Sequence, residues 1–527
     1  MAASEIGFSI SERYNASNIL FDNLARGRGA HVAVTGPVAT LSYAELCTLA
    51  AQYGEALLDL GLERGDRVLL FLDDSPTYPA AFFGAIRAGL VPVLINTLTP
   101  SDLLQFYLQD TGARVAIVDS EFCDRFNLRA CAGTQLRTAI ISNGSAPQDS
   151  AISMVSASAL LLKYNGNLVA ADTHRDDMAF WQYSSGSTGR PKGIVHLQHD
   201  LAYTADSFSK HILKMTPDDV VLSIPKIFFA YGLGNSLTFP FCVGATAILL
   251  PGQPKAAPIY EAIRTWRPTM FFGLPTLYRA LTNAPEAQTA DLSSLKLCLS
   301  AAEVLSQDVA DSWTRLSGLT IVEGMGSTEV LHIYVSNSQD AQKPGSAGRR
   351  VPGYELKLVD RDGHEVGDNE EGILWVRGDS NAPLYWNRPD KTAETMKPEG
   401  WIYTGDRMVR DADGYYFFKG RADDLIKISG QWVYPLEVEL CLAEHQMVRE
   451  CAVMPVELDD KRMSLHAYVV LNEPRMNVNT ARTTLQAYVK LTLLPYKYPR
   501  IMTFHAELPK TGTGKIDRQS LLRLLDD

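Results

Sequence analysis

The sequence contains few cysteines, and none of them is placed for a joint role. The seven stand singly along 527 residues, without a Cys-x-x-Cys pair, as Cys47, Cys123, Cys131, Cys242, Cys298, Cys441 and Cys451. This spacing argues against a zinc site and against a disulfide framework. Isolated thiols fit a reducing compartment, so we expect a cytoplasmic protein.

Basic runs, signal sequences and membrane spans are also missing from the sequence. The net charge is -11 and no long basic run occurs, so nucleic acid is not an expected partner. The segment from Met1 to Asn18 lacks a basic stretch followed by an apolar one, so no secretory signal is predicted. The most apolar stretch, residues 233 to 250, is interrupted by polar residues and by Pro240. It predicts a buried helix and strand, and we expect no membrane partner.

What the sequence does have is the alternation of helices and strands that builds a parallel sheet. Ser42 and Glu45 form a capping-box pattern before an apolar helical stripe over residues 46 to 60. Short apolar runs at 67–72, 91–95 and 114–118 alternate with helical patterns at 79–88 and 101–109. This alternation is typical of βαβ units. Residues 120 to 177 are less periodic, and we expect a variable excursion there.

The residue pattern of the sequence changes near residue 348 and again near residue 420. Short alternating segments at 355–359, 372–376 and 415–419, separated by Asp/Gly turns, predict β-hairpins and a distorted barrel. About a hundred residues follow, enough for a small separate domain. The predicted fold is α/β, with a large N-terminal domain of parallel α/β subdomains plus a β-barrel subdomain (residues 1–422) and a small α+β C-terminal domain (residues 423–527).

One loop rich in glycine and hydroxyl groups is a candidate phosphate site. The segment Tyr183-Ser184-Ser185-Gly186-Ser187-Thr188-Gly189-Arg190-Pro191-Lys192-Gly193 follows an apolar run at 178–181. Successive N–H groups in such a loop form an anion-binding concavity. The segment matches neither the Walker loop nor the nucleophile elbow of serine hydrolases. A surface Ser/Gly turn is the alternative interpretation.

Three later stretches carry residues suited to nucleotide chemistry. In Gly324-Met325-Gly326-Ser327-Thr328-Glu329, a hydroxyl beside a carboxylate can bind a phosphate oxygen and Mg²⁺, although a capped helix start would look the same. Trp401-Ile402-Tyr403-Thr404-Gly405-Asp406 ends in a carboxylate that could accept from ribose hydroxyls, or could be an ordinary turn. Lys510-Thr511-Gly512-Thr513-Gly514-Lys515-Ile516-Asp517-Arg518 is a glycine-flanked lysine, or a basic tail.

Together with Gly420-Arg421-Ala422-Asp423-Asp424, these stretches match in order five motifs of the adenylate-forming enzymes. This superfamily comprises acyl-CoA synthetases, luciferases and the adenylation domains of peptide synthetases, and the chain resembles it over nearly its whole length. The resemblance implies ATP, Mg²⁺ and coenzyme A as cofactors. It also implies two steps: a carboxylate attacks the α-phosphate of Mg·ATP, and a thiol then displaces AMP from the acyl-adenylate.

The resemblance also assigns roles to single residues. It implies that Ser184, Ser185, Gly186, Thr188 and Lys192 hold the β- and γ-phosphates, Thr328 the α-phosphate, Glu329 the Mg²⁺, and Asp406 and Arg421 the ribose. Lys515 would bridge the substrate carboxylate and the α-phosphate. The mobile C-terminal domain would rotate about a hinge at Asp423, so that Lys427 and Gly430 line the pantetheine tunnel. A lysine acetyltransferase acting on Lys515 would remove its charge.

Two stretches near the expected acyl pocket closely resemble benzoate-CoA ligases. They are Lys226-Ile227-Phe228-Phe229-Ala230-Tyr231-Gly232-Leu233-Gly234-Asn235 and Leu331-His332-Ile333. Aromatic and apolar walls suit a flat aromatic acid. The expected substrate-binding residues are Phe228, Ala230, Tyr231, Gly326, His332 and Ile333. Phe228 and His332 could instead be core residues.

Two residues depart from the superfamily's pattern, and several functions stay open. Met325 stands where many members have a tyrosine, and Ala302 stands where glycine is expected, which leaves the accepted ring substituents undecided. The leading hypothesis is an aryl-CoA ligase for benzoate or a substituted benzoate, with a 4-hydroxybenzoate-CoA ligase as the nearest rival. An enzyme that loads a carrier protein is less favoured, because no acidic residue lies near Ala230. A non-catalytic nucleotide-binding regulator would be expected to lack Lys515 or Glu329. The sequence leaves the oligomeric state open, with a homodimer as one assembly it allows.

Overall fold

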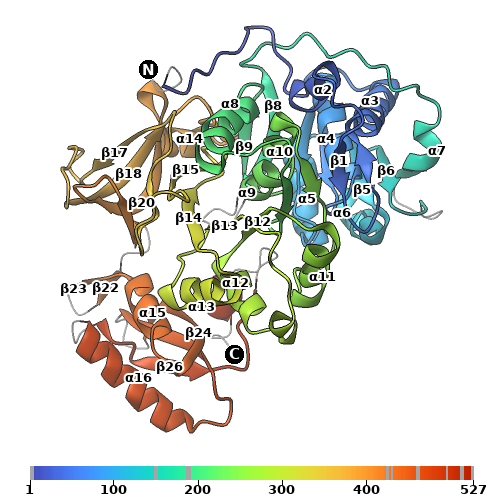
Figure 1. Cartoon of the computed structure of the whole chain (residues 1–527). Coiled ribbons are helices and arrows are strands. Elements are labelled where there is room, and N and C mark those ends of the chain that lie inside the picture. Colours follow the sequence, from blue (N-terminus) through green and yellow to red (C-terminus); the bar gives the residue numbers. More distant parts are fainter. Residues whose placement is uncertain are drawn as a thin grey trace.

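The computed structural model describes residues 5–146, 152–184, 191–422, 426–428, 431–458, 463–493, 497–510 and 516–523. Figure 1 shows a larger body of sheets and helices with a smaller C-terminal body of β24, β26, α15 and α16 beside it. None of the helices formed by these residues has both the length and the apolar character needed to cross a lipid bilayer.

A seven-stranded sheet contains the first half of the N-terminal part. Its strand order is β7-β6-β5-β3-β4-β8-β9, and only β9 runs antiparallel to its neighbour. The bounds are β3 Arg67–Phe71, β4 Val91–Leu94, β5 Val115–Asp119, β6 Thr138–Ser142, β7 Ser153–Ser156, β8 Met178–Ser184 and β9 Lys192–Leu197. The three central strands are almost fully buried, as expected for a parallel sheet covered on both faces.

Three helices of this half of the chain lie close to their predicted positions: α3 Tyr43–Asp59, α4 Thr77–Arg87 and α5 Ser101–Thr111. A further helix, α2 Asn18–Ala25, was not predicted from the sequence and packs against α3. The capping box at α3 is confirmed, because the Ser42 hydroxyl accepts from the Glu45 N–H and the Glu45 carboxylate accepts from the Ser42 N–H.

The expectation of an excursion between residues 120 and 177 is wrong for part of that segment. Its strands β6 and β7 extend the parallel sheet beyond β5, and α6 Leu128–Cys131 and α7 Ala157–Leu161 accompany them. Strand β6 has a buried apolar run of only a few residues, and β7 is a half-exposed edge strand. Neither strand therefore produces a periodicity that can be separated from a loop.

A nine-stranded sheet forms the second half, with the order β16-β15-β14-β13-β12-β10-β11-β1-β2. The strands from β14 to β1 are parallel and the outer ones antiparallel. The bounds are β1 Val32–Thr35, β2 Leu41–Ser42, β10 Val220–Ser223, β11 Thr246–Ile248, β12 Met270–Gly273, β13 Leu297–Ala301, β14 Ile321–Gly326, β15 Ile333–Ser336 and β16 Arg349–Arg350. Its helices include α8 Asp200–Thr204, α11 Ala256–Trp266, α12 Pro275–Thr282 and α13 Gln307–Ser317.

The apolar stretch 233–250 is a buried helical segment followed by a strand, which confirms its prediction. It contains the end of α9 Ala230–Leu233, the π-helical turn Gly234–Thr238, α10 Phe239–Val243 and the buried strand β11.

An antiparallel five-stranded sheet follows, as the hairpin pattern predicts. It consists of β17 Glu355–Val359, β18 Glu371–Arg377, β19 Met396–Lys397, β20 Trp401–Arg410 and β21 Tyr416–Arg421. Helix α14 Pro389–Thr395 lies between β18 and β19 in the chain.

The C-terminal residues have a hydrophobic cluster of their own, made by α15, α16 and the strands between them. The elements are β22 Ile426–Ile428, β23 Gln431–Val433, α15 Pro435–Ala443, β24 Val448–Glu457, β25 Met463–Leu471, α16 Val478–Thr492, β26 Ile501–Phe504 and α17 Arg518–Arg523. Side chains of the larger body reach this part: Arg279 Nη1 donates to the Arg449 carbonyl at 2.7 Å, and the Arg407 guanidinium lies 3.4 Å from the Tyr434 ring centroid. The boundary between residues 422 and 423 stays a prediction.

Candidate active site

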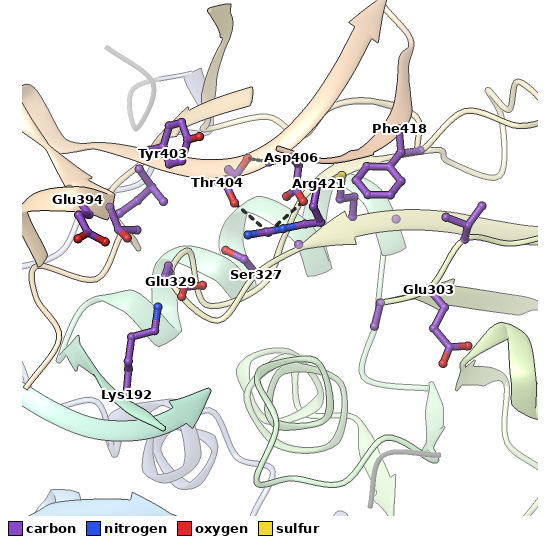
Figure 2. A pocket seen from close by; sticks show the side chains of 18 of the residues that line it. Lys192, Glu303, Ser327, Glu329, Glu394, Tyr403, Thr404, Asp406, Phe418 and Arg421 are labelled. Carbon is purple, nitrogen blue, oxygen red and sulfur yellow. Dashed lines mark hydrogen bonds and ion pairs between the residues drawn. The ribbon is translucent and has the colours of Figure 1, made fainter. Parts of the chain in front are cut away.

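A cavity of about 530 Å³ opens between the carboxyl ends of β13 and β14 and the strands β20 and β21. Carboxyl ends of parallel strands are the usual ligand site in open α/β sheets. Figure 2 shows Lys192 and Glu329 at one end of the cavity, Glu303 and Phe418 at the other, and Arg421 between them. The cavity is therefore elongated, with charged groups spaced along its length.

One end of the cavity is built around Tyr385. Its hydroxyl donates a hydrogen bond to Glu329 Oε1 at 2.7 Å, and Lys192 Nζ lies 4.4 Å from the centroid of its ring. Burial lowers the pKa of Lys192, while the nearby Glu329 carboxylate opposes that shift. A cation over the ring face and a carboxylate at the hydroxyl of one tyrosine can receive a phosphate and a divalent metal ion together.

The middle of the cavity contains the predicted ribose pair. Asp406 and Arg421 face each other across β20 and β21, and Arg421 Nη1 lies 3.1 Å from Asp406 Oδ1. The same nitrogen donates to the Thr404 carbonyl at 2.9 Å, as the dashed lines of Figure 2 mark. Burial raises the pKa of Asp406 to about 6, although Arg421 acts in the opposite direction. Asp406, Thr404 and Arg421 all line the cavity.

Thr328 is fixed through its backbone. Its carbonyl lies 2.8 Å from Nε2 of the buried His196, whose Nδ1 lies 2.8 Å from Asp200 Oδ2. Thr328 lies two residues after the end of β14, and its neighbours Ser327 and Glu329 line the cavity. The predicted Thr-Glu motif is therefore brought to the cavity by the end of a buried strand.

The predicted acyl-pocket residues form a buried aromatic group next to Gly326. A Cβ on Gly326 would overlap the His332 carbonyl, so glycine allows β14 and the His332 segment to touch. The His332 ring lies 5.8 Å from Tyr231 and 4.5 Å from Phe239, between centroids. Of the six residues, Gly326 lines the cavity itself, while the side chains of Phe228, Ala230, His332 and Ile333 are buried and that of Tyr231 is partly so.

His332 differs from an ordinary core histidine. Its side chain is 3% exposed, and neither ring nitrogen makes a hydrogen bond to any other described residue. Burial lowers its pKa to about 3, which keeps the imidazole neutral. Buried polar atoms nearly always have hydrogen-bond partners, so this imidazole departs from the usual state of a core histidine.

The two residues that depart from the superfamily's pattern both line the cavity. Ala302 has φ = 72°, in the left-handed region that favours glycine, which explains why glycine is expected at this position. Its methyl group and the side chain of Met325 narrow the cavity between Glu303 and Gly326.

Sequence reasoning missed Glu323 and Tyr385. Glu323 lines the cavity from within β14, and burial raises its pKa to about 7, with one long hydrogen bond of 3.4 Å from the Leu305 N–H. A carboxylate inside an otherwise apolar strand beside the Thr-Glu motif was an available signal. Tyr385 had no local signal, because its contact with Glu329 spans 56 residues.

Several predicted site residues lie outside the described part of the chain: Ser185, Gly186, Thr188, Asp423, Gly430 and Lys515. Ser184 is described and pairs with Lys192 across β8 and β9. For Lys427 the backbone pairs with Trp432. Lys510 and Ile516, which flank residues 511–515, form a β-bridge, and burial lowers the pKa of Lys510 against the opposing charge of Glu303. Lys510 also forms an ion pair with Glu450, within the C-terminal part.

The AMP-binding enzyme family matches residues 21–386, and the AMP-binding enzyme C-terminal domain matches residues 437–515. The first match alone covers more than half of the chain. The chain belongs to the AMP-binding enzyme family. Its cavity lies where residues of the first matched region meet β20 and β21, which separate the two matches.

Several similar members of this family are named as CoA ligases of aromatic acids. A benzoate–CoA ligase from Thauera aromatica is 42% identical over 97% of this chain and 96% of its own. A 4-hydroxybenzoate–CoA/benzoate–CoA ligase from Rhodopseudomonas palustris is 41% identical over 96% of this chain and 94% of its own. The crystal structure of the anthranilate CoA ligase AuaEII with anthranoyl-AMP superposes on this AMP-binding enzyme with a TM-score of 0.91 at 35% identity, covering 99% of both chains.

Proposed function

We propose that this AMP-binding enzyme is an ATP-dependent aryl-CoA ligase. It converts benzoate or a substituted benzoate to the CoA thioester through an acyl-adenylate and releases AMP and pyrophosphate. The observation that carries the proposal is the order of groups along the cavity: Lys192 and Glu329, then Arg421 and Asp406, then Glu303 and Phe418. This order fits the phosphates, ribose and base of one nucleotide. The names of the similar proteins indicate the kind of acid, a benzoate or hydroxybenzoate.

The chain's own residues act in the first step mainly through position and charge. Lys192 neutralises phosphate charge and Asp406 accepts from the ribose, so the α-phosphate is fixed for attack. Glu329, together with substrate phosphates, would hold Mg²⁺, and the ion would supply neutralisation of the polyphosphate. The donor set fits this ion, because a carboxylate already oriented by Tyr385 faces the cavity.

The acid is proposed to lie against Gly326, between Tyr231 and His332. A flat ring suits a wall of Tyr231, Phe239 and Ile333, and the neutral, unpaired imidazole of His332 offers a hydrogen bond to the carboxyl group. Phe228 and Ala230 would complete the wall. An aromatic acid is therefore favoured over an amino acid, since no acidic side chain faces an ammonium group among these residues.

The second step is proposed to use a different orientation of the C-terminal domain. Residues 1–422 would bind ATP and the acid, and residues 423–527 would rotate about Asp423 after adenylation. Lys515 serves the first step, and Lys427 and Gly430 then line the path of the thiol. Ser184, Ser185, Gly186 and Thr188 hold the phosphates together with Lys192. The AMP-binding C-terminal match and the influence of the Glu303 charge on the pKa of Lys510 support this proposal.

A 4-hydroxybenzoate-CoA ligase is the second candidate, favoured by the Rhodopseudomonas palustris relative named for both acids. We also propose a homodimer in the cytoplasm, and a lysine acetyltransferase that acts on Lys515. The isolated cysteines support a reducing cytoplasm as the compartment. Acetylation would remove the positive charge of Lys515, which supports its use to regulate the enzyme.

The function is tested by AMP release with Mg·ATP across a panel of acids, with CoA present and omitted. The panel contains benzoate, 4-hydroxybenzoate, 2-aminobenzoate, cyclohexanecarboxylate and hexanoate. CoA-dependent turnover that is highest with an aromatic acid supports the proposal and ranks its ring substituents. Turnover indifferent to CoA would indicate a carrier protein instead, and preference for hexanoate would contradict the assignment of Tyr231 and His332.

A further inference from the structure

The segment that leads into the acyl pocket is tied to the seven-stranded sheet by buried polar groups. Lys226 Nζ donates to Asp73 Oδ1 at 2.6 Å, and the Ile227 N–H donates to Asp74 Oδ1 at 3.2 Å. Asp73 and Asp74 follow the carboxyl end of β3, whereas Lys226 follows β10 of the other sheet. The two sheets are therefore joined at the start of the acyl-pocket segment.

The ion pair between Asp73 and Lys226 is deeply placed, with side chains 9% and 13% exposed. Both charged groups make further hydrogen bonds: Lys226 Nζ also donates to the Leu250 carbonyl at 2.9 Å, and Asp73 Oδ2 accepts from the Gly252 N–H at 2.6 Å. Breaking one side of such a pair leaves a buried charge without a partner, which is strongly unfavourable. The ion pair therefore holds Lys226 in one position relative to Asp73.

Asp74 and Asp119 extend this attachment into the sheet. Asp119, at the end of β5, accepts from the Asp73 N–H at 2.8 Å and from the Asn143 side chain at 2.7 Å. Burial raises the pKa of Asp74 to about 7, while Lys226 opposes the shift. Asp119 thus holds the backbone at Asp73, and the side-chain carboxylates of Asp73 and Asp74 bind Lys226 and Ile227.

The position of Lys226 determines the position of Tyr231. A Cβ on Gly232 would overlap the Lys226 carbonyl, so α9 is folded directly back onto that carbonyl. Helix α9 contains Ala230 and Tyr231, and the Tyr231 hydroxyl donates to the Leu299 carbonyl at 3.3 Å. A shift of Lys226 would therefore move the aromatic wall of the acyl pocket.

We propose that Asp73, Asp74 and Lys226 are positioning residues that set the fit of the aromatic acid, although none of them lines the cavity. This inference rests on the proposed aryl-CoA ligase function. The residues act through Ala230 and Tyr231, and so their loss weakens acid binding and relaxes the choice among ring substituents, while the nucleotide end at Lys192 keeps its geometry.

The test compares Lys226→Met and Asp73→Asn with a matched control at the other end of β3. Asp66 directly precedes this strand and forms an ion pair with Arg114, so Asp66→Asn removes a carboxylate beside the opposite end of β3, away from the acyl-pocket segment. Hydrogen exchange of residues 225–233 is measured by mass spectrometry without ligands. KM for benzoate and KM for ATP are measured in parallel, and Lys226→Arg tests rescue by a conserved charge.

We expect faster exchange of residues 225–233 in Lys226→Met and Asp73→Asn, and no change in Asp66→Asn. We expect KM for benzoate to rise about tenfold or more, with KM for ATP within about twofold, because a small misplacement of a positioning wall is costly. Lys226→Arg should recover part of the loss. Asp73→Asn keeps the size and an acceptor oxygen, so it carries the comparison if Lys226→Met does not fold.

Unchanged exchange in both variants, or an equal rise of both KM values, would overturn the positioning role. Failure of the unaltered enzyme to form a thioester from any aromatic acid would instead overturn the proposed function. In that case the exchange comparison alone decides whether Asp73 and Lys226 fix this segment.

Discussion

The hydroxyl of Tyr385 donates to Glu329 Oε1 at 2.7 Å, while the face of the same ring lies 4.4 Å from Lys192 Nζ. One side chain thus orients both a carboxylate and a cation at the same end of the cavity. Tyr385 itself is held in place, because it forms a β-bridge with Ile194 and packs with Ala382. The position of Glu329 therefore depends on a residue from a distant loop.

Tyr385→Phe should weaken the use of Mg²⁺. The change removes a hydrogen bond to a charged group, worth about 1.5–3 kcal/mol, but keeps the ring that faces Lys192. We expect the Mg²⁺ concentration for half-maximal pyrophosphate release to rise about tenfold or more. Calorimetry of ATP without Mg²⁺ is the control, and its affinity should be unchanged. An unaltered Mg²⁺ dependence would contradict the orienting role of Tyr385.

Asp406 should give nucleotide binding and folding stability opposite pH dependences. Burial raises its pKa from 3.8 to about 6, so the folded protein binds more protons than the unfolded chain between these values. The contribution of Asp406 to the free energy of unfolding therefore falls as pH rises through this window. Acceptance from ribose hydroxyls needs the carboxylate, so KM for ATP should rise as pH falls below about 6.

The matched variant Asp406→Asn should remove this dependence of KM on pH, since the amide does not titrate. The amide oxygen can still accept from Arg421 Nη1. The measurement runs from about pH 5 to about pH 8, which brackets the Asp406 pKa of about 6. A wild-type KM for ATP that stays constant over this range would count against the role of Asp406.

Glu323→Gln should raise thermal stability at alkaline pH. Burial raises the pKa of Glu323 from 4.5 to about 7, so ionisation of this carboxyl in the folded protein becomes unfavourable as pH rises through that window. The glutamine oxygen can keep the bond from the Leu305 N–H without a charge. We expect the Tm difference from wild type to grow as pH rises from 4.5 to about 7 and to stay at its full size above that pH. Glu12→Gln, at an exposed position, serves as the control.

Lys515→Ala should separate the two half-reactions. We expect pyrophosphate release from ATP and benzoate to fall about a hundredfold or more, because a charge next to the reacting phosphate is lost. Thioester formation from supplied benzoyl-adenylate and CoA should change less than about threefold, since a rotated C-terminal domain no longer uses Lys515. Lys510→Ala is the matched control from the same segment. Equal loss of both half-reactions would argue against rotation about Asp423.

Much of the fold followed from local patterns in the sequence. The capping box at Ser42, the apolar helices and the short buried strands predicted parallel α/β units, because each signal lies within one element. The order of strands did not follow. Strand β1 joins the second sheet beside β11, with Val34 opposite Ala247, and no local signal encodes a pairing over that separation.

The site shows the same division. Glu329 and Asp406, which the Thr-Glu and Tyr-Thr-Gly-Asp motifs singled out, both line one cavity. Tyr385 and Lys226 could not be predicted, because each acts through a partner that only tertiary packing supplies. The pairing of a carboxylate with its orienting group is a property of the folded chain.

The backbone of Ala302 has a consequence for the balance between stability and shape. A residue with a Cβ at φ = 72° costs on the order of 1 kcal/mol that a glycine would not. The same methyl group takes up room in the cavity between Glu303 and Met325. The alanine therefore costs backbone conformational energy at this wall, and it leaves a smaller cavity than glycine at position 302 would.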